Sequence, residues 1–383
     1  MKIVFAAGGT GGHIYPALAI ADQLRRMPAT EVAFIGSAAG METTIIPQYG
    51  YQLHTIALAK STLPGPLRLI PQGMAAARGV IRARSLLQQL RPQVVVGTGG
   101  YVSAPVVLAA AYMGIPTLIH EQNAVLGMAN RMLAPIVTKI LLTFAESAVP
   151  NSSRAKAVHT GLPVRDRILA ATRAEALSFW GFSPQMTTIA VLGGSQGAQK
   201  INQIFVAAAR QLVREHEIQV IHITGPRNYP QTMAEWGDII AASPSGRRYQ
   251  VVPYLEQIEY ALAAADLAVC RAGASNLAEI TVKGIPALII PYPFAAANHQ
   301  ELNAGVLQAA GAAEILRESD LTAESLVRAL SGLIKDRPRR EQMAAAAMAL
   351  ARPDAAQRIV ELIIEVHRGN PSKTKGGRTN GEA

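Results

Sequence analysis

Short apolar runs alternate with longer amphipathic stretches along this chain. In the first half the runs lie at residues 2–7, 31–36, 92–100 and 116–123. The rhythm restarts after Pro163, with runs at 187–194, 218–225, 249–254, 266–273 and 286–292. Each run is rich in β-branched residues and is followed or preceded by a stretch at helical spacing, such as residues 13–27, which is typical of strands in a helix-covered parallel sheet. The pattern predicts an α/β chain with two doubly wound parallel sheets.

The length and punctuation of the chain indicate two domains. At 383 residues the chain exceeds one ordinary core. Gly161 and Pro163 interrupt the pattern, and proline keeps its neighbour extended, so a linker is expected near 160–167. The expected parts are an N-terminal domain over 1–160, a C-terminal domain over 161–352, a final helix over 353–368 that packs back across the domains, and a disordered polar tail over 369–383.

Composition narrows the class of protein. Half of the residues are hydrophobic and 16% are charged, which is typical of a folded chain. Cys270 is the single cysteine, so an intramolecular disulfide and a cysteine metal cage are excluded. The sequence contains neither a signal-peptide pattern at its start nor an apolar run long enough for a transmembrane helix. It also lacks an Asp-x-Asp motif, so a metal site is not expected.

The net charge of +10 is concentrated in the first half of the chain. Residues 60–91 contain six cations and no acid. Arg78, Arg82 and Arg84 belong to a helical stretch whose apolar residues fall on another side, and we expect these arginines to contact an anionic membrane surface. The alternative is a sheet-covering helix with a solvated basic edge. Nucleic acid is not expected as a partner, because zinc spacing and aromatic RNA-binding patterns are missing.

Two glycine-rich turns join a strand to a helix at matching places. The first contains Thr10, Gly11 and Gly12, and the second contains Gly194 and Ser195. The first turn lacks the Lys-Ser/Thr of a phosphate loop, and it also lacks the dinucleotide-binding spacing and its acidic partner. One such turn alone could be an ordinary tight turn, but the pair favours binding of an oxyanion by backbone amides.

Polar residues also follow the expected strands of the first half. His13 lies at the exit of the first turn, where a neutral imidazole can take a proton from a sugar hydroxyl, or else cap the helix. His120 and Glu121 end another strand, and a functional pair and a hydrogen-bonded structural pair are equally compatible with the pattern. Asn123 follows them as a reader of sugar hydroxyls.

Two motifs of the second half contain further binding candidates. Residues 270–279 pass from a strand through a small-residue turn into a helix, where Glu279 suits two vicinal ribose hydroxyls. The alternative is a cap at Ser275 with Glu279 facing solvent. Residues 298–304 place His299 and Gln300 where amide groups can meet a bound hexose.

Taken together, the motifs GGTGGH, GTGGYVSAP, HEQN, GGSQGA, CRAGASNLAE and NHQELNA resemble those of the bacterial undecaprenyldiphospho-muramoylpentapeptide β-N-acetylglucosaminyltransferases, in glycosyltransferase family 28. The resemblance covers about residues 1–366. It implies a GT-B fold, which has two Rossmann-like domains with an interdomain cleft. It also implies inverting transfer of GlcNAc from UDP-GlcNAc to the C4 hydroxyl of MurNAc in lipid I, giving lipid II for peptidoglycan. Neither a cofactor nor a metal is implied.

The resemblance assigns roles residue by residue. His13 becomes the general base, with Glu121 as assistant or rival. Glu279 would hold the ribose, Ser195 the diphosphate and Arg165 the phosphates. The implied donor-binding set is Thr10, Gly11, Gly12, Asn123, Arg165, Gly194, Ser195, Leu255, Ala274, Ser275, Asn276, Glu279, His299 and Gln300. Asn276 replaces a usual threonine, and Leu255 stands where isoleucine or phenylalanine is frequent.

The same resemblance implies a cellular location, and two alternative functions stay open beside it. It implies a peripheral enzyme on the cytoplasmic face of the inner membrane, next to the wall-synthesis machinery. A non-hydrolysing UDP-GlcNAc epimerase of the same fold is one alternative, disfavoured because few acids lie near the turns. A non-catalytic membrane adaptor that binds nucleotide sugar is another, disfavoured because one chain contains both halves.

Overall fold

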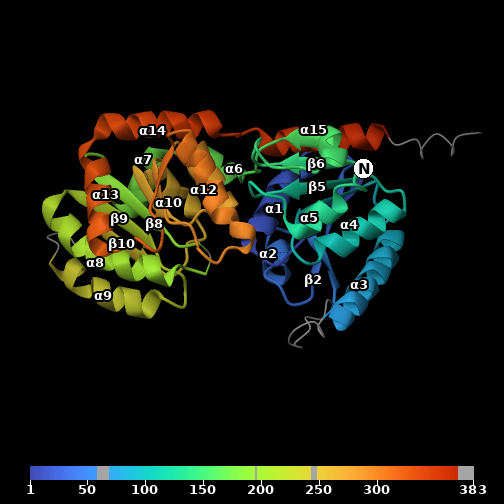
Figure 1. Ribbon diagram of the computed structural model, residues 1–383, viewed down its shortest axis with the longest axis horizontal. Coiled ribbons are helices and arrows are strands. Elements are labelled where there is room, and N and C mark those ends of the chain that lie inside the picture. The colour runs from blue at the N-terminus through green and yellow to red at the C-terminus, as the bar shows by residue number, and fades with distance from the viewer. Residues whose placement is uncertain (58–68, 195, 243–247, 370–383) are drawn as a thin grey trace, which may run out of the picture. The chain divides into compact units, whose positions relative to one another are not determined.

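The computed structural model describes residues 1–57, 69–194, 196–242 and 248–369, without the side chains of 69–76. Over these residues the chain forms two compact units, each built on one parallel sheet (Figure 1). The first unit combines Met1–Glu121, Leu126–Thr160 and the segment that begins at Asp354. The second combines Gln122–Val125 with Gly161–Pro353.

The sheet of the first unit has the order β3-β2-β1-β4-β5-β6-β7, and every neighbouring pair is parallel. Its strands are β1 (Lys2–Ala7), β2 (Glu31–Ser37), β3 (Gln52–Ile56), β4 (Val94–Gly99), β5 (Thr117–Glu121), β6 (Lys139–Leu142) and β7 (Ala157–His159). Its helices are α1 (Gly11–Arg25), α2 (Glu42–Gln48), α3 (Leu69–Leu90), α4 (Ser103–Tyr112), α5 (Met128–Leu133) and α15 (Ala355–Arg368), with a 3-10 turn at Asn151–Lys156.

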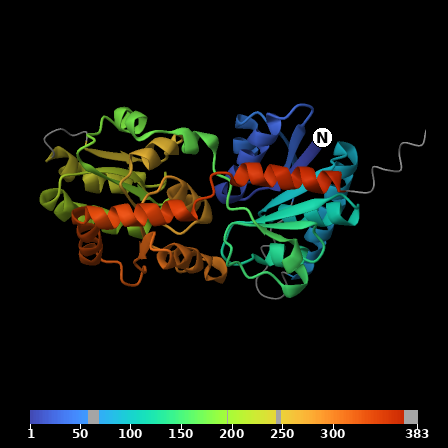
Figure 2. The same cartoon turned by 90° about the horizontal axis from the view of Figure 1, so that it is seen from above.

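Helices cover both faces of this sheet, which explains the unbroken apolar strands. On one face α3, α4 and α5 pack on Val4, Ala6 and Val95. On the other face α1, α2 and α15 pack on Ile3 and Phe5. Helix α15 packs against α1, and seen from above it lies across the first unit as the red helix on the right (Figure 2). The C-terminal helix therefore completes the core of the first unit.

The sheet of the second unit has the order β10-β9-β8-β11-β12-β13, again parallel throughout. Its strands are β8 (Thr187–Leu192), β9 (Ile218–Ile223), β10 (Tyr249–Val252), β11 (Leu267–Cys270), β12 (Ala287–Ile289) and β13 (Ala313–Ile315). Its helices are α6 (Asp166–Ala170), α7 (Arg173–Trp180), α8 (Gln199–Glu215), α9 (Tyr229–Ala241), α10 (Ile258–Ala264), α11 (Ala274–Val282), α12 (His299–Ala309), α13 (Ala323–Lys335) and α14 (Arg337–Leu350), with a 3-10 turn at Ala296–Asn298.

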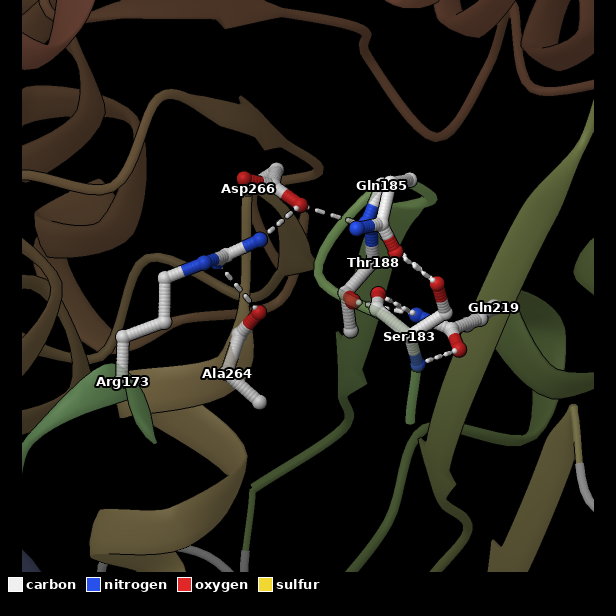
Figure 3. Close-up of polar contacts among 7 residues, drawn as sticks. All are labelled: Arg173, Ser183, Gln185, Thr188, Gln219, Ala264 and Asp266. Atoms are coloured by element: carbon white, nitrogen blue, oxygen red, sulfur yellow. Dashed lines mark hydrogen bonds and ion pairs between the residues drawn. The ribbon is translucent and has the colours of Figure 1, made fainter. Parts of the chain in front are cut away.

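A polar network closes the amino ends of the second sheet (Figure 3). Asp266, directly before β11, accepts hydrogen bonds from Arg173 at 2.9 Å and from the Thr188 amide at 2.8 Å. Gln219 donates to the carbonyl of Ser183 at 3.0 Å and accepts from its amide. These bonds tie α7 and the chain before β8 to the start of the sheet.

Both sheets reverse their order beside the first strand of the unit, between β1 and β4 and between β8 and β11. Loops after such neighbouring strands diverge to opposite faces and leave room at the carboxyl edge, where open α/β sheets bind ligands. Each glycine-rich turn of the sequence follows one of these central strands. The topology therefore positions the site.

The predicted fold class is confirmed, with two doubly wound parallel sheets. The helix expected over 13–27 begins at Gly11 and ends at Arg25. The structure adds strands that the apolar runs did not include: β3, β6, β7 and β13. Of the polar tail expected over 369–383, residues 370–383 lie outside the described part of the chain.

Candidate functional site

The first glycine-rich turn connects β1 to α1. Gly9 has a φ of +90°, which favours glycine, and the extended Thr10 is the N-cap of α1. The amides of His13 and Ile14 both donate to the Thr10 carbonyl, at 3.1 and 3.3 Å. His13 therefore occupies the first turn of the helix.

The end of β4 and Gly100, which follows it, pack directly against this turn. The Thr98 hydroxyl donates to the His13 carbonyl at 2.8 Å. A Cβ on Gly99 would lie 2.5 Å from His13 Nδ1, and one on Gly100 would lie 2.2 Å from the Gly8 carbonyl oxygen. Both glycines also have positive φ, +110° and +83°. The structure thus joins the GGTGGH and GTGG motifs, and it places the imidazole of His13 against bare backbone.

Glu121 ends β5 as a buried carboxylate that is 2% exposed. Its Oε2 accepts hydrogen bonds from Asn130 Nδ2 at 2.8 Å and from the Gly127 amide at 2.9 Å. These contacts attach the end of β5 to the start of α5 and support the structural interpretation of the polar pair with His120, which is fully buried. A catalytic role for Glu121 stays a prediction.

The second glycine-rich turn connects β8 to α8. Gly194 and Gly197 have φ of +81° and +76°, and the Gly197 amide donates to the Gly194 carbonyl at 2.9 Å. A Cβ on Gly197 would lie 2.0 Å from the Thr224 carbonyl oxygen, so the turn packs closely on the end of β9. Ser195 lies outside the described residues.

Glu279, on α11, forms a buried ion pair with Arg165. The Arg165 Nη2 to Glu279 Oε1 distance is 3.1 Å, and the side chains are 9% and 14% exposed. Burial raises the pKa of Glu279, and the charge and hydrogen bond of Arg165 act against that rise. The alternative interpretation, with Glu279 facing solvent and Ser275 as cap, is wrong, because Gly273 is the N-cap and no side chain caps the helix.

Gln300 lies in the first turn of α12 with a fixed orientation. Its Oε1 accepts hydrogen bonds from the amides of Ala272 at 3.1 Å and Tyr292 at 3.0 Å. Two consecutive non-glycine residues just before the helix, Ala297 and Asn298, have φ of 51° and 52°. Such backbone costs about 1–3 kcal/mol per residue and concentrates at functional loops.

Asn303 is a polar residue of this site that sequence reasoning left unassigned. It is fully buried, and its Nδ2 donates to Asn123 Oδ1 at 3.2 Å and to the Ala272 carbonyl at 3.1 Å. Its Oδ1 accepts from the Ala124 amide at 2.8 Å. Its place in the NHQELNA motif is the one sequence signal that marks it. Asn303 therefore fixes Asn123 within the second unit.

The predicted donor residues of the second unit come from neighbouring strand ends. Gly194 follows β8, Ala274 to Glu279 follow β11, and Gln300 follows β12, and these three strands are adjacent in the sheet. Ser275 and Asn276 lie in the first turn of α11, and Asn276 Nδ2 donates to the Arg271 carbonyl at 3.3 Å. His299 Nδ1 contacts the Ala296 carbonyl at 2.8 Å. Leu255 is half-buried on the loop after β10.

The basic helix of the first unit is α3. Arg78, Arg82 and Arg84 are exposed on it, and Ile81 beside them is 70% exposed. The opposite side buries Ala83 and its neighbours against the sheet. The helix therefore covers the sheet and presents a basic surface as well. No helix in the described ranges has the length and apolar character that a bilayer span requires.

A cavity of about 390 Å³ lies elsewhere, at the amino edge of the second sheet beside Arg173 and Asp266. None of the predicted donor residues lines it. Among the residues that the structure describes, no three His, Cys, Asp or Glu side chains are placed to hold a metal ion.

Two parallel-sheet units with glycine turns at their switch points define the GT-B class of glycosyltransferase folds. Residues 3–142 match the glycosyltransferase family 28 N-terminal domain, and residues 188–359 match the glycosyltransferase family 28 C-terminal domain. The chain belongs to glycosyltransferase family 28.

Close relatives span nearly the whole chain. A Halothermothrix orenii protein is 44% identical over 97% of this chain and 100% of its own length, and a Desulforudis audaxviator protein is 41% identical over 95% and 98%. Both are named UDP-N-acetylglucosamine–N-acetylmuramyl-(pentapeptide) pyrophosphoryl-undecaprenol N-acetylglucosamine transferase.

Solved structures agree on the fold. MurG of Acinetobacter baumannii superimposes with a TM-score of 0.75 at 31% identity, covering 95% of this chain and 99% of that one. A Neisseria meningitidis UDP-GlcNAc 2-epimerase reaches 0.66 at 15% identity, covering 95% and 100%. At that identity the likeness to the epimerase shows the fold alone.

Proposed function

We propose that this chain transfers GlcNAc from UDP-GlcNAc to the C4 hydroxyl of MurNAc in undecaprenyl-pyrophosphoryl-MurNAc-pentapeptide (lipid I), with inversion, to give lipid II. The supporting observation is the identity of 44% over 97% of the chain to a relative named as that N-acetylglucosamine transferase. The first unit takes the lipid-linked acceptor, and the second takes the nucleotide sugar.

The donor site uses the strand ends of the second unit. Glu279 accepts hydrogen bonds from the two ribose hydroxyls. Arg165, whose Nη2 lies 3.1 Å from Oε1 of Glu279, favours the charged form of this carboxylate and so opposes the burial that raises its pKa. The arginine thus serves the donor through Glu279 in addition to any phosphate that it reaches. Leu255 lies beside the uracil.

The sugar and diphosphate are held by the neighbouring turns. Because two backbone amides occupy Oε1 of Gln300, its Nε2 is the group directed at a hexose hydroxyl. His299 and Asn123 add contacts on the same sugar. Gly194 and Ser195, from the glycine-rich segment between β8 and α8, supply backbone and hydroxyl donors to the diphosphate, as do Ala274 to Asn276 at the start of α11.

The transfer step needs a base on the acceptor and stabilisation of the leaving group. His13 removes the proton from the C4 hydroxyl while that oxygen bonds to the anomeric carbon and the bond from this carbon to the diphosphate oxygen breaks. The amino termini of α8 and α11 stabilise the negative charge that develops on UDP. Thr10, Gly11 and Gly12 shape the pocket around the reacting groups.

The enzyme acts at the cytoplasmic face of the inner membrane as a peripheral protein. Arg78, Arg82 and Arg84 attract anionic lipid headgroups, and Ile81 adds apolar contact. Such a location gives access to the undecaprenyl chain of the acceptor and to the proteins of wall synthesis.

The test is incubation of the enzyme with radiolabelled UDP-GlcNAc and a lipid I analogue. Wild type should transfer label to lipid. His13→Ala should lose transfer by about a hundredfold or more, as expected for loss of a general base, and should keep UDP binding. Glu121→Gln is the comparator. Loss of transfer in Glu121→Gln with activity kept in His13→Ala would assign the base to Glu121.

The same incubation separates the rival functions. Epimerisation of UDP-GlcNAc at C2 without acceptor would identify an epimerase. Donor binding with no turnover, with or without acceptor, would indicate an adaptor. Either outcome would reject the proposed transfer.

A further inference from the structure

A buried carboxylate lies under the first glycine-rich turn. Glu42, the first residue of α2, is 0% exposed. Its Oε2 accepts a hydrogen bond from the Gly9 amide at 2.9 Å. Its Oε1 accepts two more, from the Ser37 amide at 2.8 Å and from the Ser37 hydroxyl at 2.6 Å. Both oxygens are therefore engaged, and one of them holds the turn that leads to His13.

Three glycines from different segments make room for this side chain. A Cβ on Gly8 would lie 2.3 Å from Glu42 Oε1, one on Gly40 would lie 2.0 Å from Oε2, and one on Gly36 would lie 2.7 Å from Cγ. Backbone without side chains thus surrounds the carboxylate on the β1 turn, the end of β2 and the loop before α2. A space of this shape is specific for the glutamate.

The carboxylate is charged at neutral pH. Burial acts to raise the pKa of Glu42, but the hydrogen bonds from Ser37 and Gly9 outweigh it together and leave the pKa below its ordinary value. An anion therefore sits permanently beside a backbone amide of the turn.

That position is the one where doubly wound sheets commonly bind a phosphate, at the turn after the first strand. We propose that Glu42 is a positioning residue for the transfer reaction: its carboxylate occupies the Gly9 amide in place of a substrate phosphate and fixes the turn that presents His13. This inference rests on the proposed function. It also explains why the two glycine-rich turns have different proposed roles. The Gly9 amide of the first turn already binds Glu42, so that turn serves the acceptor, and the second turn binds the diphosphate of the donor.

The experiment compares Glu42→Gln with wild type in the transfer assay. The substitution keeps the shape but replaces an acceptor by an NH₂ group, which cannot accept from both Gly9 and Ser37. We expect kcat to fall about tenfold or more, because a small displacement of a catalytic group is costly. The KM for UDP-GlcNAc and the affinity for UDP should change less than about twofold, since the residues proposed to hold the ribose and the uracil belong to the second unit. Thr44→Ala, exposed on the same helix, is the matched control and should match wild type.

A second measurement needs no turnover. Hydrogen exchange of the Gly9 amide, followed by NMR, should accelerate about tenfold or more in Glu42→Gln, because its acceptor is weakened. If Glu42→Gln does not fold, Ser37→Ala replaces it, which removes only the hydroxyl donor and should lower kcat in the same direction by a smaller factor. A folded Glu42→Gln with wild-type kcat, or with unchanged Gly9 protection, would overturn the proposal. Absence of transfer in wild type with accelerated Gly9 exchange in the variant would instead reject the proposed function alone.

Discussion

At the scale of single residues, glycine decides where His13 can lie. Gly99 has a φ of +110°, and a Cβ there would lie 2.5 Å from the imidazole. A side chain at this position therefore costs backbone energy and also displaces the proposed base. The two costs are separable, because other glycines of the same unit have positive φ without such a neighbour.

We predict that Gly99→Ala lowers kcat for transfer by about tenfold or more, because the methyl group displaces His13. The backbone at positive φ should cost about 1 kcal/mol of unfolding free energy as well. Gly114→Ala is the control, since Gly114 has a φ of +69° and nothing lies within 4 Å of the added Cβ. It should lose similar stability and keep its kcat. Equal kcat values for the two variants would show that His13 is not displaced.

A buried imidazole in the second unit should make stability depend on pH. Trp236 Nε1 donates to Nδ1 of His222 at 3.0 Å, so Nε2 carries the proton and donates to Asn202 Oδ1 at 3.0 Å. Burial lowers the pKa of His222 to about 3. The unfolded imidazole binds its proton near pH 6.5, whereas the folded one stays neutral until about pH 3.

The stability contribution is therefore complete above pH 6.5 and is lost as the pH falls from there toward 3. Between these values the unfolding free energy should decrease by up to about 1.4 kcal/mol per pH unit from this group. Urea unfolding at pH 7, 6 and 5 measures how the unfolding free energy depends on pH. In His222→Gln this dependence should be less steep by that amount. Parallel slopes would mean that His222 titrates in the native state.

At the scale of elements, the sequence predicts best the strands that are buried on both faces. Residues 3–7 and 189–192 are continuous apolar runs, and both belong to strands inside their sheets, β1 and β8. The strands missing from the prediction include β3, β7 and β13, which lie at sheet edges and have mixed polarity, as in QLHTI. Edge strands are covered less completely, so they need no apolar run.

The site shows a similar division. Glycine motifs and strand ends mark His13, Glu279 and Gln300 as candidates, because local spacing carries that signal. The buried polar residues that support the two sites pair with distant positions: Glu42 lies 33 residues from Gly9, and Asn303 lies 180 residues from Asn123. Only folding brings such pairs together, and no periodicity of the chain records them.

Helix α15 illustrates what periodicity leaves open. Its apolar face is readable from the sequence, but the sheet that receives it is not, and the structure packs it on α1. We predict that Ile359→Ala, at a fully buried position, costs about 2–5 kcal/mol of unfolding free energy in the first unit. Glu361→Ala, exposed on the same helix, should stay within about 0.5 kcal/mol of wild type. Denaturant unfolding of both variants tests this, and equal midpoints would place α15 outside the core.

The basic side of α3 leads to a prediction about membranes. Reversing Arg78, Arg82 and Arg84 to glutamate should abolish most binding to anionic vesicles, at about 1 kcal/mol per charge near the surface, while UDP binding persists. Arg210, Arg214 and Arg328, exposed in the second unit, form the control triple. Sedimentation with phosphatidylglycerol vesicles measures both. Unchanged sedimentation of the α3 variant would reject this surface as the membrane contact.

At the scale of the whole molecule, the two units have separate cores and separate proposed tasks. A ligand stabilises the state that binds it by an amount set by its concentration relative to Kd. If the donor residues act as proposed, UDP stabilises the second unit directly. The effect of UDP on local opening should then differ between the two sheets. The separate tasks of the two units can therefore be measured without any acceptor.

We predict that UDP at about a hundred times its Kd raises the free energy of local opening in the second unit by up to about 2.7 kcal/mol. Hydrogen exchange in this unit should slow accordingly. The protection should concentrate on α11 and on the first turn of α12, where Glu279 and Gln300 lie. The amides of residues 8–13 should stay unchanged, because Glu42 already occupies the Gly9 amide. Glu279→Ala, which removes the ribose contact, should lose most of the protection. Protection of residues 8–13 equal to that of α11 would mean that the first turn also binds the nucleotide, and the separate tasks of the two glycine turns would be wrong.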